Sequence, residues 1–327
     1  MRKTHSSFTE TSFEVSKLAA HVRAWLLDGE IGQLSPRTLD SRKRLLAKLE
    51  FFLTQHDYRY CGLPELREFL ASVQTPRPGP NGSRGLSSTR KTNRAGTVAT
   101  YWAILRTFFR FLVAEEVIEV SPMDRIKKPI DRPDQIQPFT EDQINALLAA
   151  ARKSHHPRRD EALLLFLLDS GLRVSEVCSL RLRDVDHSSR RCTVQGKGDK
   201  RRDVYFSATT AKALWKYLQE ETREDDSPLF LSDRGRDAGE ALTKSGLFQL
   251  VRRLGKAAGV DAVRCSPHTF RHSFAVMFLR NGGNSFSLQQ FLGHTSLTMT
   301  QRYVALAEAD MQNQHRQFSP VEGLKRK

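Results

Sequence analysis

A segment with four prolines and mixed charge divides the chain, and it constrains the fold more than any other feature. From Val120 to Pro138 the sequence reads VSPMDRIKKPIDRPDQIQP, a composition that favours extended chain over regular helix or strand. The 327 residues therefore predict two domains, because the chain on each side of this segment is long enough to fold alone. We expect a flexible arm at 1–12, a first domain at 13–119, the linker at 120–138, a second domain at 139–318 and a tail at 304–327.

Apolar residues at helical spacing dominate the first domain. Ser35 followed by Pro36 is typical of a helix start, and leucines at three- and four-residue intervals predict that this helix continues to about Gln55. Three more helices are expected at 13–27, 64–73 and 96–115, and a loop rich in Pro and Gly is expected at 74–89. The first domain is thus predicted to be entirely helical.

The second domain is also predicted to be mainly helical. Thr140 and Gln143 have the spacing of a capping box, and apolar helices are expected at 162–170 and 174–180. A strand pattern is confined to 192–194 and 203–206, two segments joined by a turn rich in Gly and Lys. The expected fold class is mainly α with one small antiparallel β-sheet.

The charge of the chain predicts a polyanionic partner. Lys and Arg total 52 against 37 Asp and Glu, a net charge of +15, and residues before and after Pro138 are both basic. No apolar run approaches the roughly 20 residues that cross a bilayer, so we expect a cytoplasmic protein. The four cysteines form no C-x-x-C pair, which indicates reduced packing residues rather than a metal or redox site.

Four separated segments each place a cation or a nucleophile beside a break in regular structure. They are GLRVSE (171–176), GKGDKRR (196–202), HTFRH (268–272) and LGHTSLTMTQRY (292–303). Taken together, these segments resemble the motifs of the tyrosine recombinases, the integrase family of site-specific recombinases, and the resemblance extends over both domains. It implies a catalytic set, in chain order, of Arg173, Lys197, His268, Arg271, His294 and Tyr303.

The resemblance also implies a chemistry that these residue types can perform. Tyr303 would attack the scissile phosphate to form a 3′-phosphotyrosine, while the planar forks of Arg173 and Arg271 would stabilise the charge of the transition state. Lys197 would protonate the leaving 5′ oxygen, and both His268 and His294 would add hydrogen bonds to the phosphate, with His268 a candidate to accept the tyrosine proton. No metal, ATP or other cofactor is then expected.

Several neighbours of these residues have structural interpretations or compete for the same roles. Lys200 is the alternative to Lys197 on the hairpin turn, and Glu176 is expected to be structural, pairing with an active-site arginine. His272 lies four residues after His268, which resembles half of a zinc site, but without a third ligand it is better explained as a helix-packing or supporting group.

Basic clusters outside the catalytic set are predicted to contact DNA phosphates. The alternative is a solvated charged face, and the family resemblance favours DNA contact. The candidates are Arg37, Arg42, Lys43, Arg44, Arg84, Arg90, Lys91, Arg94, Lys200, Arg201 and Arg202.

The family resemblance implies a helical, SAM-like core-binding domain and a catalytic domain that form a C-shaped clamp around double-stranded DNA. We expect a homotetramer that acts on two duplexes through a Holliday junction, helped by an accessory directionality factor and possessing a tail that docks on a neighbouring subunit. A mobile-element integrase is favoured over a chromosome-dimer resolvase. A type IB topoisomerase and a non-catalytic DNA-binding regulator are the alternatives.

Overall fold

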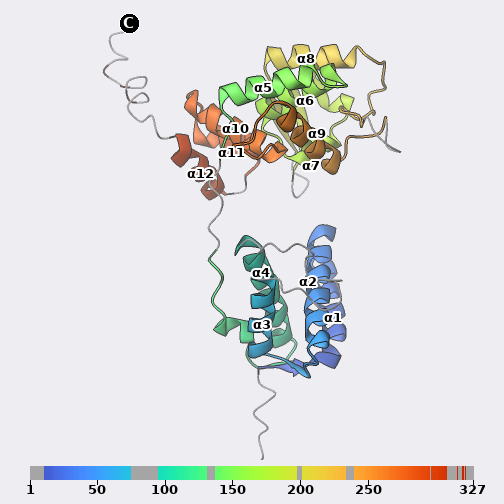
Figure 1. The fold of residues 1–327 in the computed structure, drawn as a ribbon, viewed down its shortest axis with the longest axis vertical. Helices are drawn as coiled ribbons and strands as arrows, with labels where there is room; N and C mark the ends of the chain where they lie inside the picture. Colours follow the sequence, from blue (N-terminus) through green and yellow to red (C-terminus); the bar gives the residue numbers. More distant parts are fainter. Residues whose placement is uncertain are drawn as a thin grey trace, which may run out of the picture. The chain divides into compact units, whose positions relative to one another are not determined.

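The computed structural model divides the chain into two compact units, Met1–Asp134 and Gln135–Lys327 (Figure 1). It describes residues 11–74, 95–130, 137–196, 201–232, 239–294 and 296–307, together with His315, Ser319 and Val321. Most of the predicted arm, nearly all of the loop predicted at 74–89 and nearly all of the predicted tail beyond Ala307 lie outside these residues.

The described part of the first unit contains four α-helices, two short 3-10 helices and two very short strands. Its elements are β1 Phe13–Glu14, η1 Val15–Lys17, α1 Leu18–Ile31, α2 Pro36–Gln55, β2 Tyr60–Cys61, α3 Leu63–Gln74, α4 Ala95–Ala114 and η2 Pro122–Arg125. The bounds predicted for α2 are confirmed, and the Ser35 hydroxyl accepts a hydrogen bond from the Thr38 N–H as an N-cap. The expectation that β structure is confined to the second domain is wrong, because β1 pairs antiparallel with β2. The first α-helix, expected from Phe13, begins at Leu18.

Aromatic and leucine side chains from all four helices form the core of this unit. Phe69, Phe108 and Phe109 are fully buried, and the Trp25 ring packs on Phe108. Met123 of η2 is also fully buried, and Trp102 Nε1 donates a hydrogen bond to the Ile126 carbonyl oxygen. The start of the segment predicted as a linker is therefore part of this core.

The second unit surrounds a hydrophobic helix with further helices and a small sheet. Its elements are α5 Glu141–Arg152, α6 Pro157–Ser170, α7 Val174–Ser179, η3 Leu182–Asp184, β3 Val185–Asp186, β4 Arg191–Gln195, β5 Arg201–Tyr205, α8 Ala208–Leu218, α9 Lys244–Ala257, α10 Pro267–Arg280, α11 Ser285–Leu292 and α12 Leu297–Ala307. The capping box of Thr140 and Gln143 is confirmed at the start of α5. The sheet has the order β3-β4-β5, one strand more than the sequence predicted.

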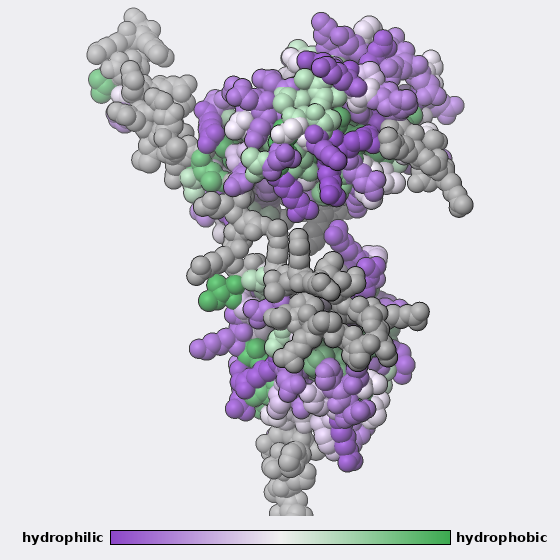
Figure 2. All heavy atoms as spheres, viewed as in Figure 1, coloured by the Kyte–Doolittle hydropathy of each residue, from purple (hydrophilic) through white to green (hydrophobic). Residues whose placement is uncertain are grey.

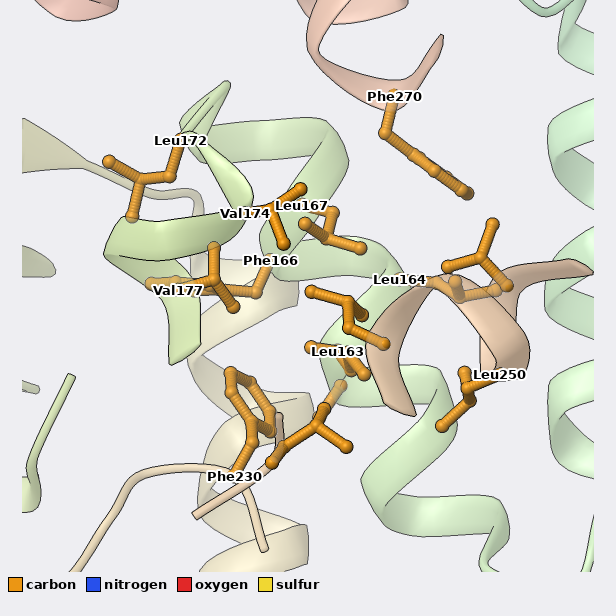
Figure 3. Close-up of a cluster of buried hydrophobic side chains, with 14 of the residues drawn as sticks. Leu163, Leu164, Phe166, Leu167, Leu172, Val174, Val177, Phe230, Leu250 and Phe270 are labelled. Atoms are coloured by element: carbon orange, nitrogen blue, oxygen red, sulfur yellow. The ribbon is translucent and has the colours of Figure 1, made fainter. Parts of the chain in front are cut away.

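The larger core of this unit lies around α6. Leu163, Leu164 and Leu167 of α6 are buried near Leu250 of α9 and Phe270 of α10 (Figure 3). Every position of α6 from Ala162 to Leu168 is apolar, which suits a segment that is covered on most sides.

A second, smaller core joins the last three helices, which lie together in Figure 1. It contains Val276 of α10, Leu288 and Leu292 of α11, and Tyr303 of α12. Leu306, expected to belong to a tail that leaves the domain, packs against this core within α12.

The surface visible in Figure 2 is mainly hydrophilic over the described parts of both units, with small hydrophobic patches. None of the helices described is long and apolar enough to cross a membrane.

Candidate active site

The first part of the site in chain order is the turn between α6 and α7. Gly171 ends α6 in the left-handed region at φ +59°, where glycine carries no Cβ penalty. A Cβ on Gly171 would lie 2.2 Å from the Phe274 ring, so only glycine lets α10 approach this closely. The Gly171 carbonyl oxygen then accepts a hydrogen bond of 2.7 Å from Arg271 of α10.

Arg271 is almost completely buried, and main-chain oxygens hold its guanidinium. Besides Gly171, it donates to the Leu292 carbonyl oxygen at 2.7 Å and lies 3.1 Å from His294 Nε2. Burial, followed by the nearby charge of Arg173, lowers the pKa of Arg271 to about 10, at which the side chain is still cationic at neutral pH. Within the described part of the chain no carboxylate forms an ion pair with Arg271, and a buried cation of this kind is suited to receive an anion.

Arg173 occupies the N-cap position of α7 and reaches the same place. Its Nη2 donates to the Gly293 carbonyl oxygen at 2.7 Å, and its Nη1 donates to Glu176 at 3.0 Å. The carbonyls of Leu292 and Gly293, at the end of α11, thus bring together two arginines that are 98 positions apart in the sequence. About a third of the Arg173 side chain is exposed, so donors of its fork are open to a ligand.

An ion pair between Glu176 and Arg202 supports the position of Arg173. Both oxygens of Glu176 accept hydrogen bonds of 2.9 Å from Arg202 of β5, and the Arg173 backbone N–H donates to the same carboxylate. Burial acts to raise the pKa of Glu176, but the hydrogen bonds from Arg202 and Arg173 outweigh it, and the pKa lies below its usual value. Arg202, expected to contact DNA, is instead engaged in this internal ion pair and donates to the Phe291 carbonyl oxygen.

Tyr303 lies on α12 with its ring 5% exposed. Its hydroxyl is 2.7 Å from His272 Nδ1, and its ring stacks on the His294 ring with centroids 6.2 Å apart. Burial raises the pKa of Tyr303, although Arg271, Arg302 and Arg173 act in the opposite direction. The phenol is therefore protonated at neutral pH, and a proton acceptor is needed before its oxygen can attack.

His294 connects the arginines to the tyrosine. Its Nε2 faces Arg271 and its Nδ1 lies 3.1 Å from the Thr300 hydroxyl, so both ring nitrogens are engaged. Burial, then Arg271 and Arg173, lowers the pKa of His294 to about 4. The imidazole is neutral at pH 7, which allows Nε2 to accept from Arg271.

His268 lies in the first turn of α10, exposed, with its ring 5.6 Å from the Phe248 ring. Burial of part of the ring, then Arg271 and Arg264, lowers its pKa. Within the described ranges no hydrogen bond joins it to Tyr303.

Lys197 and its alternative Lys200 lie in 197–200, between β4 and β5, outside the described residues. Arg201, the first residue of β5, is exposed. Of the six residues in the predicted catalytic set, Arg173, Arg271, His294 and Tyr303 therefore form one connected cluster, with His268 on the helix that carries Arg271.

The predicted DNA-contact residues of the first unit differ in their surroundings. Arg37 and Lys43 are exposed on α2, and Arg44 is exposed but pairs with Asp40 at 3.0 Å. Arg42 packs its guanidinium 4.1 Å from the centre of the buried Trp25 ring, a structural contact that the sequence did not indicate. The other four candidates, Arg84, Arg90, Lys91 and Arg94, lie outside the described residues.

Sequence reasoning did not find the roles of His272 and Arg202. The sequence predicts a helix-packing or supporting role for His272, which follows Arg271 directly on the helix of the site. Only the packing of α10 against α12 reveals that it meets Tyr303. Among the described residues, no cluster of three or more His, Cys, Asp or Glu side chains could hold a metal ion.

Known proteins with related sequences and folds are similar to this chain over both units. Residues 137–310 match the profile of the Phage integrase family. Tyrosine recombinase XerD of Listeria monocytogenes is 31% identical over 229 residues, covering 69% of this chain and 77% of the relative. Tyrosine recombinase XerC of Roseiflexus is 34% identical over 227 residues, covering 66% and 70% respectively. The Tn1549 transposon integrase, solved in complex with transposon right end DNA, is similar in fold, with a TM-score of 0.69 and 20% identity over 92% of this chain and 99% of that one.

Proposed function

Because this chain belongs to the phage integrase family of tyrosine recombinases, we propose that it cuts and rejoins double-stranded DNA at specific sites through a 3′-phosphotyrosyl intermediate. The observation that carries the proposal is the junction between α11 and α12. There the carbonyls of Leu292 and Gly293 hold Arg271 and Arg173, and the next residue, His294, stacks on Tyr303. Two cations and a nucleophile within one cluster are what attack on a phosphodiester requires.

In the proposed reaction the Tyr303 oxygen attacks the scissile phosphorus and the 5′ oxygen leaves. Arg173 and Arg271 stabilise the charge on the non-bridging oxygens, which their planar forks fit. Lys197, assigned by the family pattern, protonates the leaving oxygen. The energy of the phosphodiester is retained in the tyrosyl bond, so attack by another 5′-hydroxyl reseals the strand without ATP.

Strand exchange needs two duplexes held together. We propose a homotetramer that passes through a Holliday junction, with an accessory factor that sets direction and with the residues after Ala307 docked on a neighbouring subunit. Truncation after Ala309 tests the last point: loss of cooperative assembly on DNA is expected, and unchanged assembly contradicts it. We favour a mobile-element integrase, which predicts inverted core sites beside the gene.

The test of the proposed chemistry is a covalent adduct. Nicked duplexes tiled across the source genome, including the DNA beside the gene, are incubated with the full chain, and adducts are isolated under denaturing conditions and sequenced. We expect an adduct at defined sites that Tyr303→Phe abolishes while DNA binding is retained. Tyr205→Phe, at an exposed tyrosine of β5, is the matched control and should leave the adduct unchanged.

The alternatives give different outcomes in the same experiments. An adduct that survives Tyr303→Phe excludes Tyr303 as the nucleophile, and a site-bound protein without any adduct indicates a non-catalytic regulator. Relaxation of supercoiled plasmid without exchange between two sites indicates a type IB topoisomerase.

A further inference from the structure

The closest polar partner of the Tyr303 hydroxyl is a histidine that the proposed mechanism has not yet used. His272 Nδ1 lies 2.7 Å from this oxygen, and the two rings are 5.7 Å apart at an interplanar angle of 41°. The two residues come from α10 and α12, which pack against each other. The contact is at the distance over which a proton is transferred to a general base.

The other two histidines of the site are less suited to receive this proton. His294 has one ring nitrogen facing Arg271 and the other facing Thr300, and it meets Tyr303 with its ring face rather than with a nitrogen. His268 packs beside Phe248, and within the described ranges it makes no hydrogen bond with Tyr303. Among the histidines that the structure describes, His272 alone directs a ring nitrogen at the Tyr303 oxygen.

We propose that His272 is the general base that takes the hydroxyl proton of Tyr303 as this oxygen attacks the scissile phosphate. The inference rests on the proposed function, and it replaces His268 as the candidate acceptor. In the cleavage step the bond between the Tyr303 oxygen and phosphorus forms, the bond between phosphorus and the 5′ oxygen breaks, and the phenol proton moves to Nδ1. The leaving oxygen takes its proton from the acid, Lys197, so that the phenol proton stays on the protein at His272 and one proton passes from Lys197 to the DNA. Religation runs the same transfers in reverse.

Burial and the charges around His272 disfavour the protonated form of its ring, so that a nitrogen lone pair is available to accept a proton. Burial, followed by His268, Arg271 and Arg302, lowers its pKa to about 4, so the ring is neutral at pH 7. With the ring proton on Nε2, the lone pair of Nδ1 faces the phenol. The groups that act on His272 come from its own helix (His268, Arg271), from α12 (Arg302) and from His294, two residues after the end of α11. A bound phosphodiester would add negative charge beside these cations and thereby favour the imidazolium formed during attack.

The experiment compares two substitutions of His272 in the full chain, on the nicked duplex identified by its wild-type adduct. His272→Asn keeps a polar atom near the position of Nδ1 but cannot accept a proton. His272→Ala removes both the polar atom and the proton acceptor. We expect single-turnover cleavage to slow by about 10² to 10⁴-fold in both variants, with DNA binding unchanged. The rate of both should rise with pH, because the phenol must then ionise before it attacks. His155→Asn, at an exposed histidine, is the matched control and should cleave like the wild type.

A substrate with a 5′-bridging sulfur separates the base from the acid. A thiolate leaves without protonation, so this substrate should restore cleavage to Lys197→Ala but not to either His272 variant. Rescue of the His272 variants by sulfur would contradict the proposal, since it would place His272 on the leaving-group side.

The outcomes distinguish failure of the role given to His272 from failure of the proposed function. A Tyr303-dependent adduct in the wild type, together with wild-type cleavage by His272→Asn, would show that His272 only positions the phenol and would overturn the inference while leaving the proposed function intact. Absence of any adduct from the wild type would overturn both.

Discussion

Arg202 and Glu176 form a two-pronged ion pair that ties the β-hairpin to the start of the helix bearing Arg173. Two guanidinium nitrogens of Arg202 lie 2.9 Å from the two carboxylate oxygens, and both side chains are largely removed from solvent. The same carboxylate holds Arg173, so the orientation of a proposed catalytic cation depends on a residue of β5.

Arg202→Ala should therefore affect both stability and cleavage. Removing Arg202 takes two hydrogen bonds from the buried carboxylate of Glu176 and leaves it with Arg173, which should cost about 3 kcal/mol in the free energy of unfolding. Denaturant unfolding measures this cost, and single-turnover cleavage should slow because Arg173 loses its support. Arg201→Ala, at the exposed neighbouring position, is the control for stability and should leave the free energy of unfolding unchanged. Wild-type stability in Arg202→Ala would show that the pair contributes nothing.

Substitution of Gly171 by alanine should be more costly than the same change at Gly259. Both glycines have positive φ, +59° and +67°, so each substitution incurs a left-handed backbone penalty of about 1 kcal/mol. Only at Gly171 does the new Cβ collide with the Phe274 ring, because nothing lies within 4 Å of a Cβ at Gly259. We expect about 3 kcal/mol for Gly171→Ala and about 1 for Gly259→Ala in denaturant unfolding. Equal costs would show that α10 shifts freely away from the turn.

The second unit should lose stability as the pH falls from 6.5 toward 4. His294 has a pKa of about 4 in the folded protein because of burial and then of Arg271, against an ordinary value of 6.5, so protons bind preferentially to the unfolded chain. Its contribution, about 3 kcal/mol at most, is complete above pH 6.5 and is lost as the pH falls through the folded pKa. Urea unfolding between pH 7.5 and 5 measures the slope.

A substitution separates His294 from the other groups that titrate in this range. His294→Gln should make the slope shallower, whereas His155→Gln, at an exposed position, should leave it unchanged. The series stays above pH 5 because the pKa of Glu176, lowered by Arg202 and Arg173 against the effect of burial, adds a further loss of stability only below its usual value of about 4.5. An unchanged slope in His294→Gln would contradict the prediction.

Two adjacent basic residues of α2 should have different roles. Arg42 packs on the buried Trp25 ring, so Arg42→Ala should lower the stability of the first unit by about 1 kcal/mol. Lys43 is exposed, and Lys43→Ala should leave stability unchanged while reducing the salt dependence of binding to a non-specific duplex, by about 0.9 in the slope of log K against log salt. The opposite pattern would show that Arg42, not Lys43, contacts phosphate.

Local signals in the sequence predicted much of the fold. The Ser35–Pro36 start, the capping box of Thr140 and Gln143, and the glycine after Ser170 each depend on neighbours within a few positions, and the structure has a helix end at each. The short pairing of β1 with β2 was missed because two residues per strand carry no alternating pattern.

The spacing of residues in the sequence does not predict contacts between distant segments. The motif of Arg173 contains Glu176, but nothing in it indicates that Arg202 completes the carboxylate's hydrogen bonds. In the same way, the basic character of Arg42 predicted a DNA contact, whereas its position against α1 gives it an aromatic partner. Charge identifies a residue type that can bind phosphate, but the tertiary fold decides whether its charge is available.

The second unit has two cores, and the residues of the candidate active site depend on the smaller one, which is formed by the later part of the chain. The larger core around α6 is made of residues up to Phe270, whereas the carbonyls that hold Arg173 and Arg271 belong to Leu292 and Gly293, beside the smaller core. During synthesis, the larger core can thus be completed while both arginines still lack their final anchors and the tyrosine has not been added. A chain that ended before α11 would keep the residues of the larger core but would lack both Tyr303, the proposed nucleophile, and the carbonyls that hold the two arginines.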